Sequence, residues 1–177
     1  MKIKILDIGS GIHPVEGADT LDYADVPNLT YKHDCNIFPY PIKDESYDVI
    51  YANHVIEHLD DIGKFIAEIK RILKVNGTLI IKVPYVSSNI SFQDPTHKHS
   101  FCYYTFDYFA VNPEKHMEIW FTPQLLWIVK RKLNFVKDGI RFYNHLIEWC
   151  ANKFPIHYEN LFKWILPARE LEVVMRK

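Results

Sequence analysis

Leu6-Asp7-Ile8-Gly9-Ser10-Gly11 is the stretch of sequence that decides the fold. It follows the apolar residues Ile3 and Ile5, so it predicts a short buried strand that ends in a glycine turn. The two glycines let the backbone come close to a ligand, and Asp7 supplies an acceptor at the carboxyl end of the strand. In open parallel sheets, ligands bind in the crevice outside those carboxyl ends. The stretch therefore predicts an α/β protein with a binding site directly after its first strand.

The composition indicates one domain over residues 1–177 and no nucleic-acid partner. About half of the residues are apolar, which is enough for a sizeable core, and 21 basic residues stand against 22 acidic ones. The three cysteines are odd in number and widely spaced, which favours a reducing compartment over disulfides or a structural zinc. Early charges argue against a signal peptide, and no apolar run is long enough for a membrane span. We expect a cytoplasmic protein.

Four further strands and one long helix are predicted for the first half of the chain. Residues 47–52 are apolar almost throughout, which is typical of a strand covered on both faces. Residues 60–73 repeat apolar side chains at three- and four-residue steps, which predicts a helix capped by Asp60 or Asp61. A strand, a helix and a strand in this order give a parallel unit with a right-handed crossover. The predicted strands cover residues 2–8, a short run ending at 22, 29–33, 47–52 and 78–83.

The pattern is looser in the second half. Residues 85–121 are rich in aromatic residues, histidine and proline and have no sustained period, which indicates an irregular insertion over the carboxyl edge of the sheet. We expect this insertion to form a cap on the substrate side. The elements predicted beyond it are a helix over 123–132, a strand over 134–142, a helix over 146–163 interrupted near Pro155, and a last strand over 171–175.

Several segments, in this order, resemble the class I S-adenosylmethionine-dependent methyltransferases, and more closely the small methyltransferase type 11 group. They lie between residues 5 and 84, somewhat under half of the chain. The resemblance implies an α/β, Rossmann-like, doubly wound and mostly parallel sheet with its last strand antiparallel. It also implies S-adenosyl-L-methionine as cofactor and methyl transfer as activity. The segments are residues 6–11, the acidic strand end at Asp22, Asp34 with Cys35, residues 46–50, residues 53–59 and residues 68–84.

The resemblance implies a cofactor lying along the carboxyl end of the sheet. Asp22 would accept both ribose hydroxyls, as a carboxylate does at the end of strand two in dinucleotide folds. Asp34 would accept the adenine amino group, and the backbone N–H of Cys35 would donate to a ring nitrogen. The remaining implied contacts are those of Asp7, Gly9 and Gly11 at the aminoacyl end and ribose, of Phe38 or Ile37 on the adenine face, and of Asn53 and His54 beneath the methyl donor.

These residues also have purely structural alternatives. Asp7 could tie the turn by accepting backbone N–H groups, the two glycines could serve the turn alone, and Asp22 could cap a helix. Glu57 and His58 lie at the end of a short helix-like segment. We expect them to bond to neighbouring backbone rather than to act in catalysis.

The connection after the glycine turn is shorter than the resemblance implies. Ten residues, 12–21, separate Gly11 from Asp22, whereas a Rossmann-type unit spans about twenty residues from its glycine loop to the acidic residue. We therefore expect a first crossover helix shortened to about one turn. The short connection also weakens a nicotinamide-binding interpretation.

Asp94-Pro95-Thr96-His97-Lys98-His99 is the second informative segment, just beyond the fifth predicted strand. His97 or His99 could be the general base for an acceptor hydroxyl, with Asp94 orienting the imidazole, because the ordinary pKa of histidine lies near neutrality. Asp94, His97 and His99 could instead hold a metal ion, since they form an oxygen and nitrogen ligand set. A third alternative is that they only hydrogen-bond loop backbone and hold the insertion shut.

The function indicated is methyl transfer from S-adenosylmethionine to a small-molecule or glycan acceptor, through a hydroxyl. We expect a monomer or homodimer. Two alternatives stay open: a non-catalytic cofactor-binding partner subunit, and a metal-dependent enzyme centred on Asp94, His97 and His99. Nucleic-acid methylation is less favoured, because Ala52-Asn53-His54-Val55 lacks the Pro-Pro-aromatic signature of amino-directed enzymes and the charge is balanced.

Overall fold

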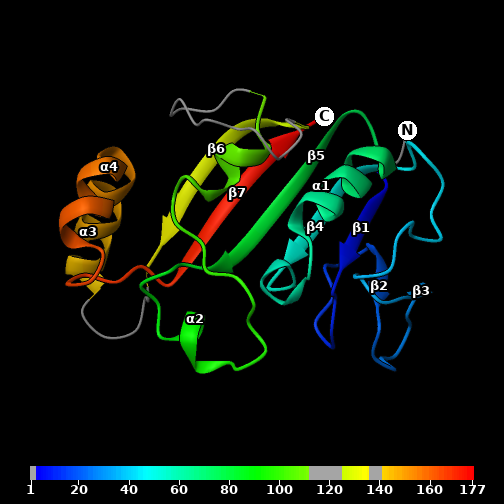
Figure 1. The fold of residues 1–177 in the computed structure, drawn as a ribbon, viewed down its shortest axis with the longest axis horizontal. Helices are drawn as coiled ribbons and strands as arrows, with labels where there is room; N and C mark the ends of the chain where they lie inside the picture. The colour runs from blue at the N-terminus through cyan, green and yellow to red at the C-terminus, as the bar shows by residue number, and fades with distance from the viewer. Residues whose placement is uncertain (1–2, 112–124, 136–140) are drawn as a thin grey trace.

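The computed structural model describes residues 3–111, 125–135 and 141–177, and these form a seven-stranded sheet with the strand order β3-β2-β1-β4-β5-β7-β6 (Figure 1). β7 runs antiparallel to both of its neighbours, and the pairs on the β3 side of β5 are all parallel. The predicted fold class is confirmed. The strands are β1 (Ile5–Ile8), β2 (Asp19–Asp22), β3 (Tyr31–Lys32), β4 (Tyr47–Asn53), β5 (Leu73–Pro84), β6 (Trp127–Asn134) and β7 (Glu170–Arg176).

Helix α1 (Ile62–Ile72) packs on one face of the sheet, across β4 and β1 (Figure 1). Its apolar residues Phe65, Ile66, Ile69 and Ile72 are fully buried, as the three- and four-residue spacing predicts. Asp61 caps the helix, because its Oδ1 accepts a hydrogen bond from the N–H of Lys64 at 2.9 Å. The parallel β4-α1-β5 unit thus forms as expected.

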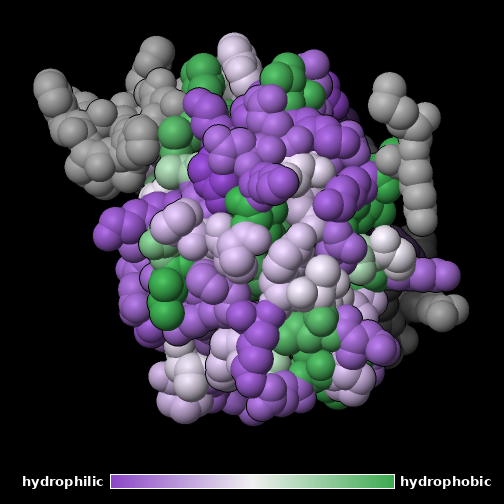
Figure 2. Space-filling view, turned by 90° about the vertical axis from the view of Figure 1, so that its right-hand side faces the viewer, coloured by the Kyte–Doolittle hydropathy of each residue, from purple (hydrophilic) through white to green (hydrophobic). Residues whose placement is uncertain are grey.

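The first three connections between strands contain no helix. Residues 9–18, 23–30 and 33–46 form turns and loops. The shortening that the sequence predicts for the first crossover is therefore carried further, and it extends to the next two connections. Figure 2 shows the adjoining edge of the molecule, which is mostly hydrophilic with hydrophobic side chains in small separate patches.

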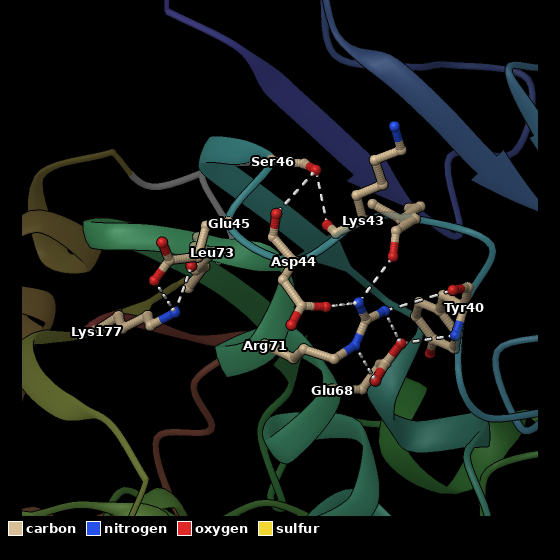
Figure 3. A network of polar contacts seen from close by, with 10 residues as sticks. Tyr40, Lys43, Asp44, Glu45, Ser46, Glu68, Arg71, Leu73 and Lys177 are labelled. Carbon is tan, nitrogen blue, oxygen red and sulfur yellow. Dashed lines mark hydrogen bonds and ion pairs between the residues drawn. The ribbon is translucent and has the colours of Figure 1, made fainter.

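The loop over residues 33–46 is tied to α1 by charged side chains (Figure 3). Arg71 donates to both carboxylate oxygens of Glu68, at 2.9 and 2.6 Å, and to the carbonyl of Ile42 at 2.8 Å. Glu68, which is 7% exposed, accepts in turn from the N–H of Tyr40 at 2.6 Å. Asp44 adds a further contact with Arg71. The loop is thus fixed to the helix without a helix of its own.

The second half of the chain departs from several predictions. β6 occupies residues predicted as a helix, because three strand-forming residues, Trp127, Ile128 and Val129, begin it and its backbone pairs with β7. The strand predicted over 134–142 is wrong at both ends: Asn134 ends β6 and Arg141 begins α3, while residues 136–140 lie outside the described ones. The remaining elements are η1 (Ile56–His58), α2 (Ile90–Gln93), η2 (Thr105–Phe109), α3 (Arg141–Lys153), α4 (Pro155–His157) and the single π turn η3 (Tyr158–Phe162).

The two faces of the sheet differ in burial. Along β5 and β7 fully buried residues alternate with half-buried ones, and β4 follows the same pattern from Ile50 onward. The sequence predicts a β4 covered on both faces, but Val49 and Tyr51 are only partly buried. The first three connections, which contain no helix, leave this face less covered. The core accordingly lies on one face of the sheet. It is covered there by α1 and by the aromatic segment 101–110.

Candidate active site

A cavity of ≈ 450 Å³ opens at the carboxyl ends of β1, β2, β3 and β4. Loops that follow these strands form most of its wall, and two residues of the segment beyond β5 complete it. This is the position that the glycine turn predicts for a ligand. The lining residues are Gly9, Asp22, Tyr23, Asp34, Cys35, Asn36, His54, Val55, His58, Leu59, Thr96 and Lys98.

Asp22 lies at the end of β2 and is 6% exposed. Its Oδ2 accepts from the N–H of Gly11 and its Oδ1 from the N–H of Ala24, both at 2.9 Å. Asp22 thus lines the cavity and ties two loops, whereas the alternative that it caps a helix is wrong, because residues 23–30 contain no helix. A carboxylate offers about four lone-pair sites, so two remain for the hydroxyls of a ligand.

Asp34 and Cys35 line the cavity from the loop after β3. Oδ1 of Asp34 accepts from the N–H of Asn36 at 2.9 Å, which shapes the turn, while the side chain stays exposed. Burial raises the pKa of the Cys35 thiol to about 12, so the group stays protonated at neutral pH. Cys35 is therefore suited to contact a ligand through its backbone or thiol surface, and not to act as a nucleophile.

Contacts within the protein fix the conformation of the glycine turn. Gly9 has a φ of +66°, and a Cβ there would lie 2.7 Å from Cβ and Cγ2 of Val55. Gly11 has a φ of +52° and faces open space, and it does not line the cavity. Asp7 is 2% exposed and accepts from the N–H of Val15 at 2.8 Å, so it ties the turn. Burial raises the pKa of Asp7, although the hydrogen bond from Val15 acts to lower it.

Phe38 and Asn53, both predicted to contact the cofactor, do not line the cavity. The ring of Phe38 stacks on Tyr40, with centroids 5.4 Å apart and an interplanar angle of 13°. Oδ1 of Asn53 is buried and accepts no hydrogen bond from the described residues. The hydrophobic side of the predicted adenine site is therefore supplied by other residues of the wall, among them Val55 and Leu59.

His54 lines the cavity directly after β4, with a φ of 55°. Its Nε2 lies 3.2 Å from Oε1 of Glu170, and its Nδ1 lies 3.3 Å from Oε1 of Glu57. These carboxylates, Glu170 first, raise the pKa of His54 to about 9, although burial opposes the shift. The floor of the cavity therefore carries an imidazolium at neutral pH.

The segment 94–99 reaches the cavity, but through residues other than the three predicted ones. Thr96 and Lys98 line the wall, whereas Asp94, His97 and His99 do not. Nε2 of His99 lies 2.9 Å from the carbonyl oxygen of Leu59, which is a structural contact. The ring of His97 lies 4.8 Å from that of His58, centroid to centroid, and Nε2 of His97 lies 3.8 Å from Oδ2 of Asp94.

His58 is the residue whose position the sequence predicts least well. It lines the cavity, and its Nδ1 lies 2.9 Å from Oγ1 of Thr96, so it bonds to a side chain from a distant segment and not to local backbone. Neither carboxylate oxygen of Glu57 accepts a hydrogen bond from the described residues. The segment 94–99 is held here by the N–H of Lys98, which donates to the carbonyl of Glu57 at 2.8 Å. A pairing across about forty residues leaves no local pattern in the sequence.

Comparison with known proteins agrees with this geometry. The family model described as a methyltransferase domain matches residues 17–81, somewhat over a third of the chain. No curated protein matches the chain. Among solved structures, the chain is similar to S-adenosylmethionine-dependent methyltransferases from Archaeoglobus fulgidus (18% identity, TM-score 0.58, 99% of this chain and 86% of that one) and Mesorhizobium loti (12%, 0.58, 99% and 91%).

A further similar structure is the complex between the Trm112 methyltransferase activator of Haloferax volcanii and a methyltransferase, with 15% identity and a TM-score of 0.59 over 99% of this chain and 84% of that one. At these identities the likeness concerns the fold. Residues 17–81 thus match a methyltransferase domain, and the fold is that of S-adenosylmethionine-dependent methyltransferases. The chain is an enzyme that transfers methyl groups, and S-adenosylmethionine is its cofactor. None of the described helices is both long and apolar enough to cross a membrane.

The residues of the wall fit this cofactor. Asp22 and Asp34 offer carboxylate oxygens to hydroxyl and amino groups, and Cys35, Val55 and Leu59 offer apolar surface. The cytoplasmic location and the monomeric or dimeric state stay predictions.

Proposed function

We propose that the enzyme methylates a hydroxyl group of a small-molecule or glycan acceptor. The observation that supports this most is a chain of hydrogen bonds at the cavity wall, which runs from His58 through the Thr96 hydroxyl to Asp94. Such a chain suits a group that carries oxygen and has to lose a proton. An amine acceptor is already nucleophilic when neutral and has less need of it.

The cofactor would lie with its ribose at Asp22 and its adenine near Asp34 and Cys35. The acceptor would enter beside His58, Thr96 and Lys98, and residues 85–121 would form the cap over it within a single domain. Residues 112–121 of this cap lie outside the described ones. Of the three predicted catalytic residues, we keep Asp94 and His97 next to the acceptor and assign His99 to loop structure, because its Nε2 contacts the Leu59 carbonyl.

The chemistry asks mainly for positioning. The sulfonium already activates the methyl group, so the acceptor oxygen attacks the methyl carbon in line while the carbon–sulfur bond breaks and its electrons return to sulfur. Holding the two reactants in that geometry supplies much of the acceleration. The hydroxyl proton must leave the oxygen, and we expect it to be lost at the polar wall beside His58.

The cofactor assignment is tested by calorimetry with S-adenosylhomocysteine. Asp22→Asn should weaken binding about tenfold or more, because a hydrogen bond from a ligand hydroxyl to a buried carboxylate is worth about 1–3 kcal/mol. Asp25→Asn is the matched control, since the Asp25 side chain is 87% exposed and pairs with Lys32 at the surface. Equal affinities in the two variants would remove Asp22 from the site.

The acceptor is tested by measuring formation of S-adenosylhomocysteine with a panel of sugars, phenols, amines and carboxylic acids. We expect turnover with one or more hydroxyl compounds and none with the others. Methylation of an amine or carboxylate, with all hydroxyl compounds inactive, contradicts the proposal.

A further inference from the structure

Glu57 is a buried carboxylate with fewer partners than such a group needs. It lies in η1, is 0% exposed, and neither of its oxygens accepts a hydrogen bond from the described residues. The nearest cationic atom is Nδ1 of His54 at 3.3 Å, and His54 is shared with Glu170. Buried charges are ordinarily paired, hydrogen-bonded or bound to metal ions. Glu57 therefore shares its one cationic neighbour with Glu170, and its Oε2 is left to bind a second cation.

A ring nitrogen of His58 lies beside this carboxylate. Its Nδ1 lies 2.9 Å from Oγ1 of Thr96, and that hydroxyl donates its single proton to Oδ1 of Asp94 at 2.7 Å. The N–H of Thr96 also donates to Oδ1 of Asp94, at 2.8 Å, so this carboxylate oxygen acts as an acceptor. Thr96 Oγ1 must then accept from His58, which places a ring proton on Nδ1. The lone pair of Nε2 is left free.

His97 is oriented in the same way. Its Nδ1 lies 3.4 Å from the carbonyl oxygen of Ser91, and a carbonyl can only accept, so Nδ1 carries the proton. The Nε2 lone pair is again available. Histidines that bind metal ions are typically held by a hydrogen bond from their other ring nitrogen to a carbonyl or carboxylate. Both rings thus have the outer partners of metal ligands.

We propose that Glu57, His58 and His97 form a binding site for a divalent transition-metal ion. One ligand atom from each of these residues lies within 4.8 Å of the others. Ligands bound to one ion at about 2.1 Å lie roughly 3–3.5 Å apart, so binding needs a contraction of about 1 Å. Two imidazoles and one carboxylate favour Zn²⁺, Mn²⁺ or Fe²⁺ over Mg²⁺ or Ca²⁺.

This ligand set differs from the alternative that the sequence suggests. His97 belongs to both sets, but His99 is held by the Leu59 carbonyl and Asp94 holds Thr96. Asp94 and Thr96 therefore act as positioning residues for His58. Glu57 replaces Asp94 as the carboxylate ligand because it is the one buried without a hydrogen bond.

The site has a consequence for the acceptor, which rests on the proposed function. His58 lines the cavity, and three protein ligands leave coordination positions open for an oxygen of the acceptor. An ion at this point would lower the pKa of a bound hydroxyl, so that its proton leaves to water. The oxygen then forms the bond to the methyl carbon as the carbon–sulfur bond breaks, which yields the methyl ether and neutral S-adenosylhomocysteine. The acceptor is thus a hydroxyl compound whose oxygen binds the ion directly.

The experiment is a calorimetric titration of chelator-treated protein with Zn²⁺ and, separately, Mn²⁺. We expect one ion per chain, and a loss of affinity of more than about 100-fold in Glu57→Gln and His97→Gln, since ligands matter more than outer partners. His99→Gln is the matched control, because it changes a histidine of the same segment outside the ligand set. Thr96→Val should weaken binding roughly 10-fold or more, and Thr96→Ser should restore it.

Each variant is also titrated with S-adenosylhomocysteine, whose affinity should be unchanged. Loss of ion binding with cofactor binding intact separates this proposal from the cofactor assignment. If Glu57→Gln does not fold, the histidine ring resonances of the unaltered protein decide: Zn²⁺ should shift those of His58 and His97 and spare His99. No binding at millimolar ion, or equal losses in His97→Gln and His99→Gln, overturns the proposal.

Discussion

The two halves of the sheet are stabilised in different ways. From β4 to β7, one face packs against α1 and an aromatic cluster in which Phe101 and Phe106 stack with centroids 5.5 Å apart. From β1 to β3, the connections contain no helix, and side-chain oxygens hold the loops instead. Asp7 accepts from the N–H of Val15, and Asp22 from those of Gly11 and Ala24.

The difference shows what a crossover helix contributes and what can replace it. A helix satisfies its own backbone and buries an apolar stripe, whereas a loop needs a partner for each buried N–H and C=O group. Side chains at strand ends supply these partners here, which leaves the loop backbone close to the cavity. We therefore expect single substitutions to cost most where burial is apolar and least where one hydrogen bond is removed.

The largest effect is expected for Phe106→Ala. Phe106 is fully buried between Phe101 and Phe109, so its removal leaves a cavity and should lower the free energy of unfolding by about 4 kcal/mol. Urea unfolding followed by fluorescence measures this. Phe92→Ala is the control, because Phe92 is 64% exposed and its loss should change stability by less than about 0.5 kcal/mol. Similar values for the two variants would mean that the aromatic cluster is not part of the core.

Gly9→Ala should cost about 3 kcal/mol. The new Cβ would meet Val55 at 2.7 Å, and the left-handed backbone adds strain of its own. Gly11→Ala introduces the same left-handed backbone strain, but its new Cβ would lie in open space. A cost of about 1 kcal/mol is therefore expected. Val55→Ala removes the colliding atoms. In a double-mutant cycle its combination with Gly9→Ala should therefore cost less than the sum of the two. Strict additivity would show that the turn does not pack on Val55.

Arg71→Ala should cost about 2 kcal/mol, because it leaves the buried Glu68 carboxylate without its cationic partner and frees the loop over residues 33–46. Lys64→Ala is the matched control on the same helix. Its ion pair with Asp61 is exposed, and less than about 0.5 kcal/mol is expected. Hydrogen exchange of the Tyr40 N–H should speed up in the first variant only. An unchanged exchange rate of the Tyr40 N–H in Arg71→Ala would show that the Arg71–Glu68 pair does not hold the loop.

The first half of the fold could be predicted because its signals are local. Alternation and apolar runs place β4 and α1, and Asp61 marks the helix start. Asp22, Asp34, Cys35 and His54 reach the cavity because each follows a parallel strand, and such strands end at one edge. The sequence could not show that the Cβ position of Gly9 faces Val55, which is a contact between loops.

The second half could not be predicted in the same way. Residues 127–134 become a strand because β7, about forty residues further on, supplies the pairing edge. Glu57 and His58 meet Thr96 and His97 through a loop that returns to η1, held by Lys98. The orientation of the histidine rings and the lack of hydrogen bonds at Glu57 depend on this contact between distant segments. The set of candidate metal ligands could therefore be recognised only in the three-dimensional structure.

The smallest effect is expected for Tyr47→Phe. This variant tests the half of the sheet from β1 to β3, where hydrogen bonds from side chains replace helices. The ring of Tyr47 is fully buried, and its hydroxyl donates to Oδ2 of Asp19 at 2.6 Å and lies 3.3 Å from the hydroxyl of Tyr31. Removing one oxygen keeps the packing and deletes a tie between β4 and β2, so about 1 kcal/mol is expected in urea unfolding. Tyr31→Phe should cost less, because the bond to Asp19 survives. If Tyr47→Phe instead cost as much as Phe106→Ala, hydrogen bonds would stabilise the helix-free half as strongly as apolar burial stabilises the other.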